Sequence, residues 1–464
     1  MGGLRQAALR PCTAQLRRSR LQLPGGGRGG PRPCGGRGDA LMSSSFSGLR
    51  DAHVHIAHHG WELSLPSLAS CASLEECLSR AAEEAQRLSR DQWVVLAAAR
   101  PQAWPEGRFP TARELDEAVG ARPAIVRSFD FHALAASATA LALAGIDAAT
   151  PDPPGGTIDR DQASGEPTGL LLESAMELVD DLRPAPTQQE RREHIRRALA
   201  DFAARGFVEV HDMLSWPWLW RELAAIDREE GLPLRVRLTA PLEAVDEAAA
   251  ERKAFESDRL TLGGVKIFTD GTLNSRTAWM LEPYADPRPE APCGVSMLSD
   301  EAIERALRAA EERGLDLTAH AIGDAAVRRM LDVVERAQPR TRVRIEHAQF
   351  VDEQDAARLV ELGVVASMQP CHLLADVEAI EQLVPHRAHR AFPVRDLWEA
   401  CERAGVDPAS RIWFGSDAPV VPPEPADNLQ AAVFRRRTGE ERAVAPEQAI
   451  SQEQALALMR PPGG

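Results

Sequence analysis

The stretch Gly264-Val265-Lys266-Ile267-Phe268-Thr269-Asp270-Gly271 decides how the rest of the chain is interpreted. Its apolar run from Val265 to Phe268 predicts a buried strand, and the Thr-Asp-Gly that follows is typical of a turn. A lysine stands inside this strand, although Lys253 is the only other lysine among 54 basic residues. We therefore expect Lys266 to have a function at this strand, as a metal ligand, rather than to reflect average composition.

Seven other segments also predict strands, and helical patterns lie between most of them. They are Asp51–Ile56, Phe207–His211, Leu234–Leu238, Leu315–Ala321, Val343–His347, Val364–Gln369 and Ile412–Gly415. Strands that alternate with helices indicate a parallel sheet. Eight such units over this length favour an α/β fold of the (β/α)8 TIM-type barrel, with a doubly wound open sheet as the alternative. No glycine-rich nucleotide motif supports the open sheet.

Two regions lack this regular alternation. Residues 60–200 predict a large insertion after the first strand, with strands at Trp93–Ala99 and Ala124–Phe129 and a Pro/Gly-rich loop over Pro151–Thr157. Residues 1–50 hold nine arginines and one acidic residue, with Gly and Pro clustered at 24–38, which predicts a disordered basic tail. A start at Met42 is an alternative, and the barrel is expected over residues 51–460.

Composition excludes several kinds of partner. The net charge of −15 argues against nucleic acid and anionic membrane surfaces. No apolar run approaches the ~20 residues that a membrane span needs. The seven cysteines are scattered without a CxxC pair, which favours free thiols in a reducing, cytoplasmic setting. These features leave a small-molecule substrate as the expected partner, and self-association into a homo-oligomer stays open.

Side chains that ligate metals stand at the ends of the predicted strands. These residues are His53, His55, Lys266, His320, His347 and Asp417. His53 and His55 are two residues apart, so their imidazoles share one face of a strand and can chelate one ion. In a barrel all these strand ends meet at one mouth, where the loops build the site. Six residues of ligand type at one mouth predict a metal centre.

This set resembles the amidohydrolase superfamily of metal-dependent hydrolases, and longer stretches look like its YtcJ-like branch, amidohydrolase family 3. The matching stretches are Val265–Gly271 with Ser275–Ala278, His320–Asp324, Arg344–Ala348, Gln369–His372 and Gly415–Val420, and within the insertion Thr150–Pro153 with Gly155-Gly156 and Gly165–Gly169. The resemblance covers about 51–460. Family members usually carry a β-sandwich that flanks the barrel, and here that sandwich is expected to be missing or rudimentary.

The resemblance implies a binuclear site. A neutral, desolvated lysine amine can react with CO2 to form an anionic carbamate, which two cations would stabilise. Carbamylated Lys266 would then bridge two divalent ions, with His53, His55 and Asp417 on one and His320 and His347 on the other. Imidazole and carboxylate ligands suit Zn2+, with Mn2+ or Fe2+ as alternatives.

The implied reaction is hydrolysis of an amide-like, non-peptide C–N bond. A bridging water would have its pKa lowered towards ~7, and Asp417 would accept its proton and pass it to the leaving amine. His132, Arg276 and His372 are candidate substrate-binding residues, and Asp270, Asp324 and Glu346 are candidates for orienting the ligands. Two alternatives remain: an esterase or lactonase with the same site, and a catalytically inactive barrel that serves as a binding module.

Overall fold

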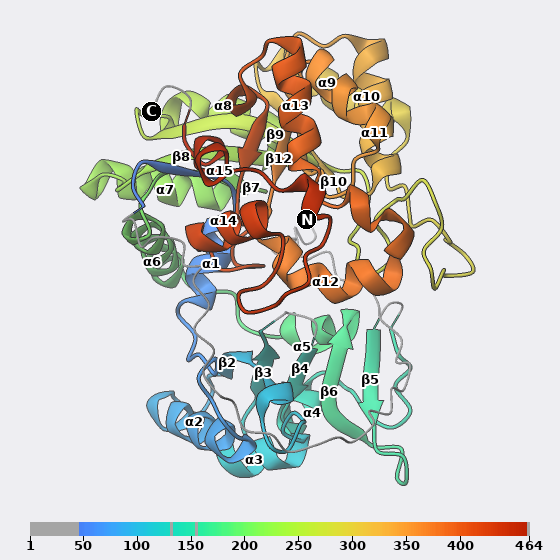
Figure 1. Ribbon diagram of the computed structural model, residues 1–464. Helices are drawn as coiled ribbons and strands as arrows, with labels where there is room; N and C mark the ends of the chain where they lie inside the picture. The colour runs from blue at the N-terminus through green and yellow to red at the C-terminus, as the bar shows by residue number, and fades with distance from the viewer. Residues whose placement is uncertain (1–45, 130–132, 154–155, 462–464) are drawn as a thin grey trace, which may run out of the picture.

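The computed structural model describes residues 46–129, 133–153 and 156–461, and its larger sheet is a parallel barrel of eight strands (Figure 1). The strands follow one another in chain order around the barrel. They are β1 (Leu49–Val54), β7 (Phe207–Met213), β8 (Arg235–Pro241), β9 (Leu260–Phe268), β10 (Asp316–Ala321), β11 (Val343–His347), β12 (Val365–Met368) and β13 (Ile412–Phe414). All eight predicted strands are therefore present, and the barrel, rather than the open sheet, is confirmed.

The barrel closes where its first and last strands meet. The two strands share no extended ladder, but the Asp417 amide donates to the His53 carbonyl oxygen at 2.7 Å and the His55 amide to that of Ala418 at 2.8 Å. The register of the remaining strand pairs determines which residue of the neighbouring strand lies beside each predicted metal ligand. Lys266 pairs with Thr318, and Glu346 pairs with His320. Residues far apart in sequence are thus placed at one height in the barrel.

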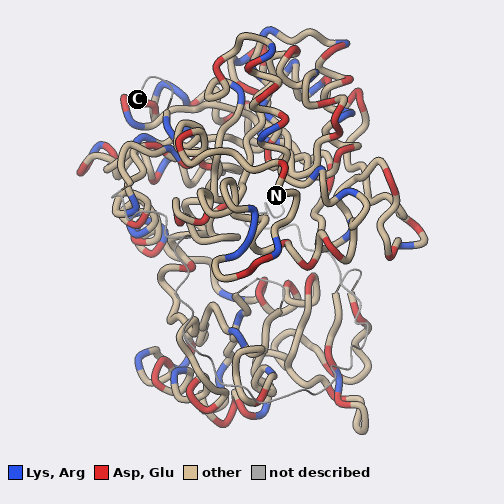
Figure 2. Tube along the Cα trace, viewed as in Figure 1, with Lys and Arg blue, Asp and Glu red and all other residues tan. Residues whose placement is uncertain are grey.

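Helices surround the barrel because each presents one apolar stripe to it. In α9 (Asp300–Glu312) the buried residues are Ile303, Ala306, Leu307 and Ala310, which is the spacing of a single helix face. The other helices of this outer ring are α7 (Pro217–Glu230), α8 (Val245–Phe255), α10 (Asp324–Ala337), α11 (Glu353–Glu361) and α13 (Val394–Ala404). Acidic and basic residues lie close together along these outer helices (Figure 2), as in the pairing of Arg358 with Asp332 and Glu335.

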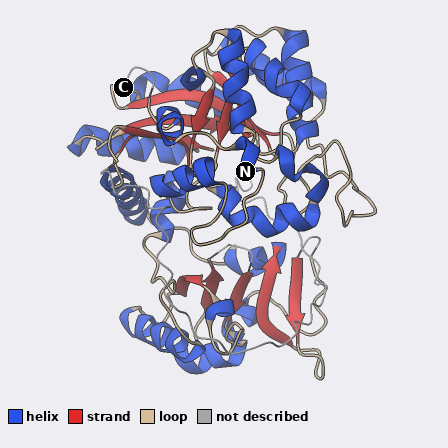
Figure 3. Ribbon diagram, in the orientation of Figure 1, coloured by secondary structure: helices blue, strands red, loops and turns tan. Residues whose placement is uncertain are grey.

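The segment after β1 forms a second sheet beside the barrel (Figure 3). Helix α1 (Ile56–Glu62) leads into it and α6 (Gln188–Ala204) leads back to β7. The five strands run in the order β2 (Val94–Ala99), β3 (Ala124–Ser128), β4 (Ala133–Ala136), β6 (Pro167–Glu173) and β5 (Gly156–Arg160). The helices with this sheet are α2 (Leu74–Arg87), α3 (Ala112–Val119), α4 (Ala138–Leu143) and α5 (Glu177–Asp180). We call this part, from β2 to α5, the inserted lobe.

Part of the loop predicted over Pro151–Thr157 is a strand instead. Gly156 opens β5, and a Cβ at this position would lie 2.2 Å from the Ala175 nitrogen. Gly156 therefore reflects a close approach of two backbone segments, although glycine in a sequence usually indicates a turn.

The ends of the described chain add no sandwich. The strands of the described ranges form the barrel and the sheet of the inserted lobe. After β13 come α14 (Pro425–Phe434) and α15 (Gln452–Leu458), the latter opened by the capping box of Ser451 and Gln454. Among the described helices, none is long and apolar enough to cross a bilayer.

Candidate metal centre

The six residues predicted as metal ligands lie at the carboxyl ends of the barrel strands. The His53 ring centroid is 5.5 Å from that of His55 and 4.9 Å from that of His347. The rings of His347 and His320 are 4.5 Å apart. The four histidines, contributed by three strands, therefore form one cluster, and Asp417 and Lys266 adjoin it.

His53, His55 and Asp417 direct ligand atoms at a common point. Asp417 Oδ1 lies 3.3 Å from His53 Nε2 and 3.0 Å from His55 Nε2, and the ligand atoms of the three residues lie within 4.8 Å of one another. The other ring nitrogens are already bound. His53 Nδ1 donates to Glu346 Oε2 at 2.8 Å, and His55 Nδ1 donates to the Met213 carbonyl oxygen at 2.9 Å. With Nδ1 engaged in this way, each ring turns its Nε2 towards the carboxylate.

This arrangement requires a positive charge at the common point. Two lone pairs and a carboxylate oxygen face one another, and only a cation or a proton between them makes the contacts favourable. Burial lowers the pKa of His53 to about 4, so this ring stays neutral at pH 7. Burial raises the pKa of Asp417, but the neighbouring His53 and His55 outweigh it and hold that pKa well below its usual range. The donor set fits a divalent metal ion.

Protons compete with a metal ion at His55. Burial lowers the pKa of this ring, but the hydrogen bond to Asp417 and the charges of Asp417 and Asp212 together outweigh burial, and the pKa is raised. A metal ligand must give up its proton, so binding at this point is expected to weaken as the pH falls.

Lys266 is a buried amine without a polar partner. It is 3% exposed, and among the described residues its side chain makes no hydrogen bond or ion pair. Its Nζ lies 5.2 Å from the centroid of the Phe268 ring. Burial lowers the pKa of Lys266 to about 8, and its charge in turn lowers the pKa of His53, His320 and His347. Lys266 thus lies within electrostatic reach of the whole cluster, and its amine is unusually easy to deprotonate.

His320 and His347 complete the cluster from neighbouring strands. His320 Nε2 donates to the Gly271 carbonyl oxygen at 3.1 Å, which leaves Nδ1 as the lone-pair nitrogen. His347 has a φ of 72° and Asp417 a φ of 63°, in the left-handed region that side chains with a Cβ rarely adopt. Such backbone strain concentrates at functional sites, where the surrounding fold holds a side chain in place.

Of the three carboxylates considered for orienting the ligands, Glu346 contacts the cluster directly. Burial raises the pKa of Glu346, but Arg344 and His53 outweigh it and hold the pKa at about 2, so Glu346 is ionised. Asp270 accepts from the amides of Trp279, Ile322 and Gly323, and its Oδ1 lies 3.6 Å from His320 Nε2. Asp270 thus ties the loop after β9 to the end of β10.

Asp324 lies outside the cluster. It accepts from the Leu281 amide and pairs with Arg387, so its contacts are with the surrounding loops.

Three supporting groups were missed in the sequence. The Met213 carbonyl and Asp212 lie at the end of β7, where Asp212 Oδ2 accepts from the Ile56 amide at 2.7 Å. Asp51 Oδ1 accepts from the Ser416 amide at 2.9 Å and from the His53 amide at 3.2 Å, which fastens β1 to the end of β13. A carboxylate inside an otherwise buried strand was the one signal that could have indicated Asp51.

The candidate substrate-binding residues have different surroundings. His372 Nε2 donates to the Ser416 carbonyl oxygen at 3.0 Å and lies 4.0 Å from Asp417 Oδ2, so His372 borders the cluster. Arg276 pairs with Asp286 at 2.7 Å, and no ion pair or hydrogen bond joins its side chain to the ligand cluster within the described ranges. His132 lies outside the described residues.

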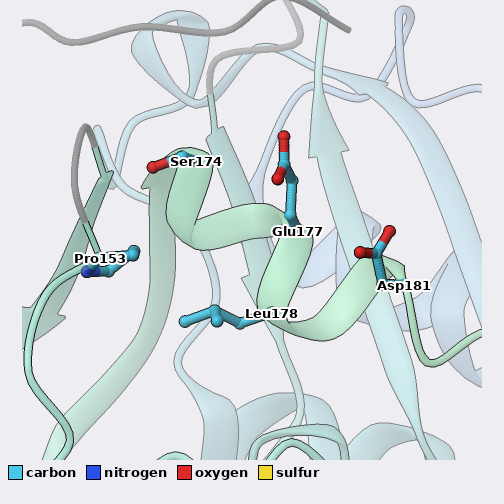
Figure 4. A pocket seen from close by; sticks show the side chains of 5 residues that line it. All are labelled: Pro153, Ser174, Glu177, Leu178 and Asp181. Atoms are coloured by element: carbon cyan, nitrogen blue, oxygen red, sulfur yellow. The ribbon is translucent and has the colours of Figure 1, made fainter. Parts of the chain in front are cut away.

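A separate hollow of about 460 Å³ lies in the inserted lobe (Figure 4). Its lining residues are Pro153, Ser174, Glu177, Leu178 and Asp181. Figure 4 shows the carboxylates of Glu177 and Asp181 apart from each other on separate turns, so they do not converge on a common ligand position.

The chain is similar to known hydrolases along most of its length. A family model described as "Amidohydrolase family" matches residues 46–462. The putative amidohydrolase YtcJ of Bacillus subtilis is 31% identical over 411 residues, which cover 85% of this chain and 74% of that protein. The N-substituted formamide deformylase of Arthrobacter pascens is 26% identical over 443 residues, which cover 90% of this chain and 79% of that enzyme.

A solved structure shares the fold. It is that of a metal-dependent hydrolase from Pyrococcus horikoshii, with a TM-score of 0.70 and 27% sequence identity. The match covers 89% of this chain and 79% of the other, so the similarity spans the inserted lobe as well as the barrel.

Proposed function

The chain belongs to the amidohydrolase family, and we propose that it hydrolyses an amide-like, non-peptide C–N bond of a small molecule with the help of divalent metal ions. The convergence of His53 Nε2, His55 Nε2 and Asp417 Oδ1 carries this proposal, because three electron-pair donors face one point. The strained backbone at His347 and Asp417 is typical of functional sites, which favours an active enzyme over an inactive barrel.

The cluster can be divided between two ions. His53, His55 and Asp417 would hold one ion, and His320 and His347 the other. Lys266, carbamylated by CO2, would bridge them, which is supported by its burial and by the lack of a polar partner for its amine among the described residues. When bound, ions such as Zn2+ lower the pKa of water and polarise a carbonyl group.

The side chains of the chain itself supply orientation and proton transfer. Glu346 and the Met213 carbonyl accept from Nδ1 of His53 and His55, which orients both rings with Nε2 towards the ion. Asp417, ionised and held in a strained conformation, would accept a proton from the attacking water and deliver it to the leaving amine. His372 would contact the substrate from beside Asp417, and Arg276 and His132 would be further substrate-binding residues.

The C–N bond is favoured over an ester by the similarity to an N-substituted formamide deformylase. A carbonyl carbon bound to oxygen could be attacked in the same site, so an esterase or lactonase remains the second candidate. The buried free thiols Cys71, Cys77, Cys371 and Cys401 support our proposal that the protein acts in a reducing, cytoplasmic setting.

Metal analysis and a substrate screen test this proposal. Full-length protein grown with zinc and bicarbonate is expected to hold about two ions per chain, as binuclear hydrolases do. It is then screened with N-formyl and N-acyl amines, cyclic amides and simple esters. Protein that takes up no metal under these conditions would contradict the metal-dependent function, and turnover of esters alone would replace the C–N assignment.

Asp417→Asn separates proton transfer from metal binding. The amide keeps an oxygen ligand but cannot accept a proton, so metal is retained and turnover falls by about 10²- to 10⁴-fold. Asp407→Asn, at an exposed 3-10 helix cap, is the matched control. Near-full turnover by the Asp417 variant would refute its role in proton transfer.

A further inference from the structure

A buried arginine lies directly beneath the candidate metal centre. Arg344 stands two residues before Glu346 in β11, so both side chains share the inner face of the barrel. It is 1% exposed, and its charge is therefore almost entirely removed from water. Desolvation of an isolated guanidinium is costly, so its partners decide whether the position is tolerated.

The partners of Arg344 come from four different strands. Nη2 pairs with Glu346 Oε1 at 2.9 Å and donates to the Ala52 carbonyl oxygen at 2.9 Å. The same nitrogen lies 3.2 Å from Ser367 Oγ, and Nη1 donates to His211 Nδ1 at 3.1 Å. One side chain thus joins β1, β7, β11 and β12 across the barrel interior.

Two of these contacts lead to the same metal ligand. Glu346 accepts from His53 Nδ1 at 2.8 Å, and Ala52 is the residue immediately before His53. Arg344 therefore restrains the His53 ring through the carboxylate and the His53 backbone through the preceding carbonyl group. Nη2 makes both of these contacts while Nη1 binds His211, so the planar guanidinium is held in one orientation, which the single nitrogen of a lysine ammonium cannot reproduce.

We propose that Arg344 is a positioning residue that sets the place of His53 in the metal centre by fixing Glu346 and the Ala52 carbonyl together. The proposal rests on the metal-dependent function proposed above. Without the guanidinium, the ionised Glu346 would lose its ion-pair partner and would keep only the hydrogen bond from His53. His53 would then be held at one point instead of two.

The competing explanation is that Arg344 only stabilises the fold. Arg435 offers a direct comparison, since it is 0% exposed and donates to the carbonyl oxygens of Ala391, Phe392 and Val444. Arg435 is as buried and as fully engaged as Arg344, yet its partners lie away from the metal ligands. Loss of either arginine is expected to destabilise the protein, whereas only loss of Arg344 should weaken metal binding.

The test measures zinc affinity of the full chain by competition with a chromophoric chelator, alongside thermal unfolding of the zinc-free protein. Arg344→Met is expected to bind zinc about 10- to 100-fold more weakly than wild type, the range for losing a group that orients a ligand. Arg435→Met is expected to lower the unfolding temperature and to keep wild-type zinc affinity. In the background of Glu346→Gln, Arg344→Met should weaken zinc binding clearly less than it does alone, because much of its effect passes through Glu346.

If Arg344→Met does not fold, Arg344→Lys still tests the positioning role. It retains the charge but loses the planar guanidinium, and we expect its zinc affinity to lie between those of wild type and Arg344→Met, at least threefold below wild type. A folded Arg344→Lys or Arg344→Met protein with wild-type zinc affinity would overturn the positioning role. An equal loss in Arg435→Met would do so too, whereas wild-type protein that binds no zinc would instead refute the metal-dependent function.

Discussion

Gly415→Ala tests how the closure of the barrel positions the metal centre. Gly415 follows β13, where the last strand passes beside β1. A Cβ at this position would lie 2.6 Å from the His53 backbone nitrogen, 2.9 Å from the His53 Cβ and 3.0 Å from Asp51 Oδ1. Two of these three atoms belong to the His53 backbone and Cβ, which cannot turn away as the end of a flexible side chain can.

The size of the effect follows from these distances. The His53 nitrogen must retreat from 2.6 Å to at least 3.4 Å to reach an ordinary contact, a displacement of about 0.8 Å. Metal–ligand distances tolerate only about 0.2 Å, so zinc affinity should fall by about 10- to 100-fold. Overpacking is expected to lower the free energy of unfolding by about 1–3 kcal/mol. The smaller conformational freedom of the unfolded alanine variant offsets up to about 1 kcal/mol of this loss.

Zinc affinity by chelator competition and thermal unfolding of the zinc-free protein measure the two effects separately. Gly264→Ala is the control, because its Cβ would meet Thr318 Oγ1 at 3.0 Å and the Asp316 carbonyl oxygen at 3.2 Å, contacts that are less close than those of Gly415 and do not involve His53. We expect this variant to lose some stability and to keep wild-type zinc affinity. If Gly415→Ala binds zinc as tightly as wild type, the close contact between β13 and His53 does not control the position of this ligand.

Three other changes address the bridge, the fold and the thiols. Lys266→Ala should lose bridged metal, and a short carboxylic acid should restore part of it; two tightly bound ions without added acid would refute the bridge. Burial raises the pKa of Asp201, but the hydrogen bond from His59 contributes to holding it at about 2. The Asp201 side chain is partly exposed, so solvent weakens its interactions. We therefore expect Asp201→Asn to lower the free energy of unfolding at pH 7 by only about 1 kcal/mol. Because the carboxylate pKa is depressed on folding, this difference should persist above pH ~4 and vanish as the pH falls towards ~2 in urea titrations. Burial raises the pKa of Cys77 to about 12, so a thiol reagent followed by peptide mapping should label the more exposed Cys293 in the native protein and Cys77 only after unfolding.

Much of the barrel could be predicted from local patterns. Each strand is a short apolar run, and the ligand-type residues stand at or near the ends of such runs, as His320 and His347 do. Parallel strands bring their carboxyl ends to one mouth, so a list of strand ends already predicts a cluster. The inserted lobe was only partly foreseen, because Gly156 resembles a turn in the sequence while its close neighbour, Ala175, comes from another element.

By itself the sequence determined the barrel, the order of its strands and which residues stand at their mouth, because these depend on apolar periodicity and on the chemistry of single side chains. Only the tertiary structure decided how those residues are held. The lone pair of His55 is directed by a carbonyl at Met213, and the barrel is closed by Asp51 bonding to the Ser416 amide. Lys266 is isolated from any polar partner in the described part of the chain. The contacts with Met213 and Ser416 join residues 158 and 365 positions apart through backbone groups that every residue possesses, and therefore no local pattern of side chains can encode them.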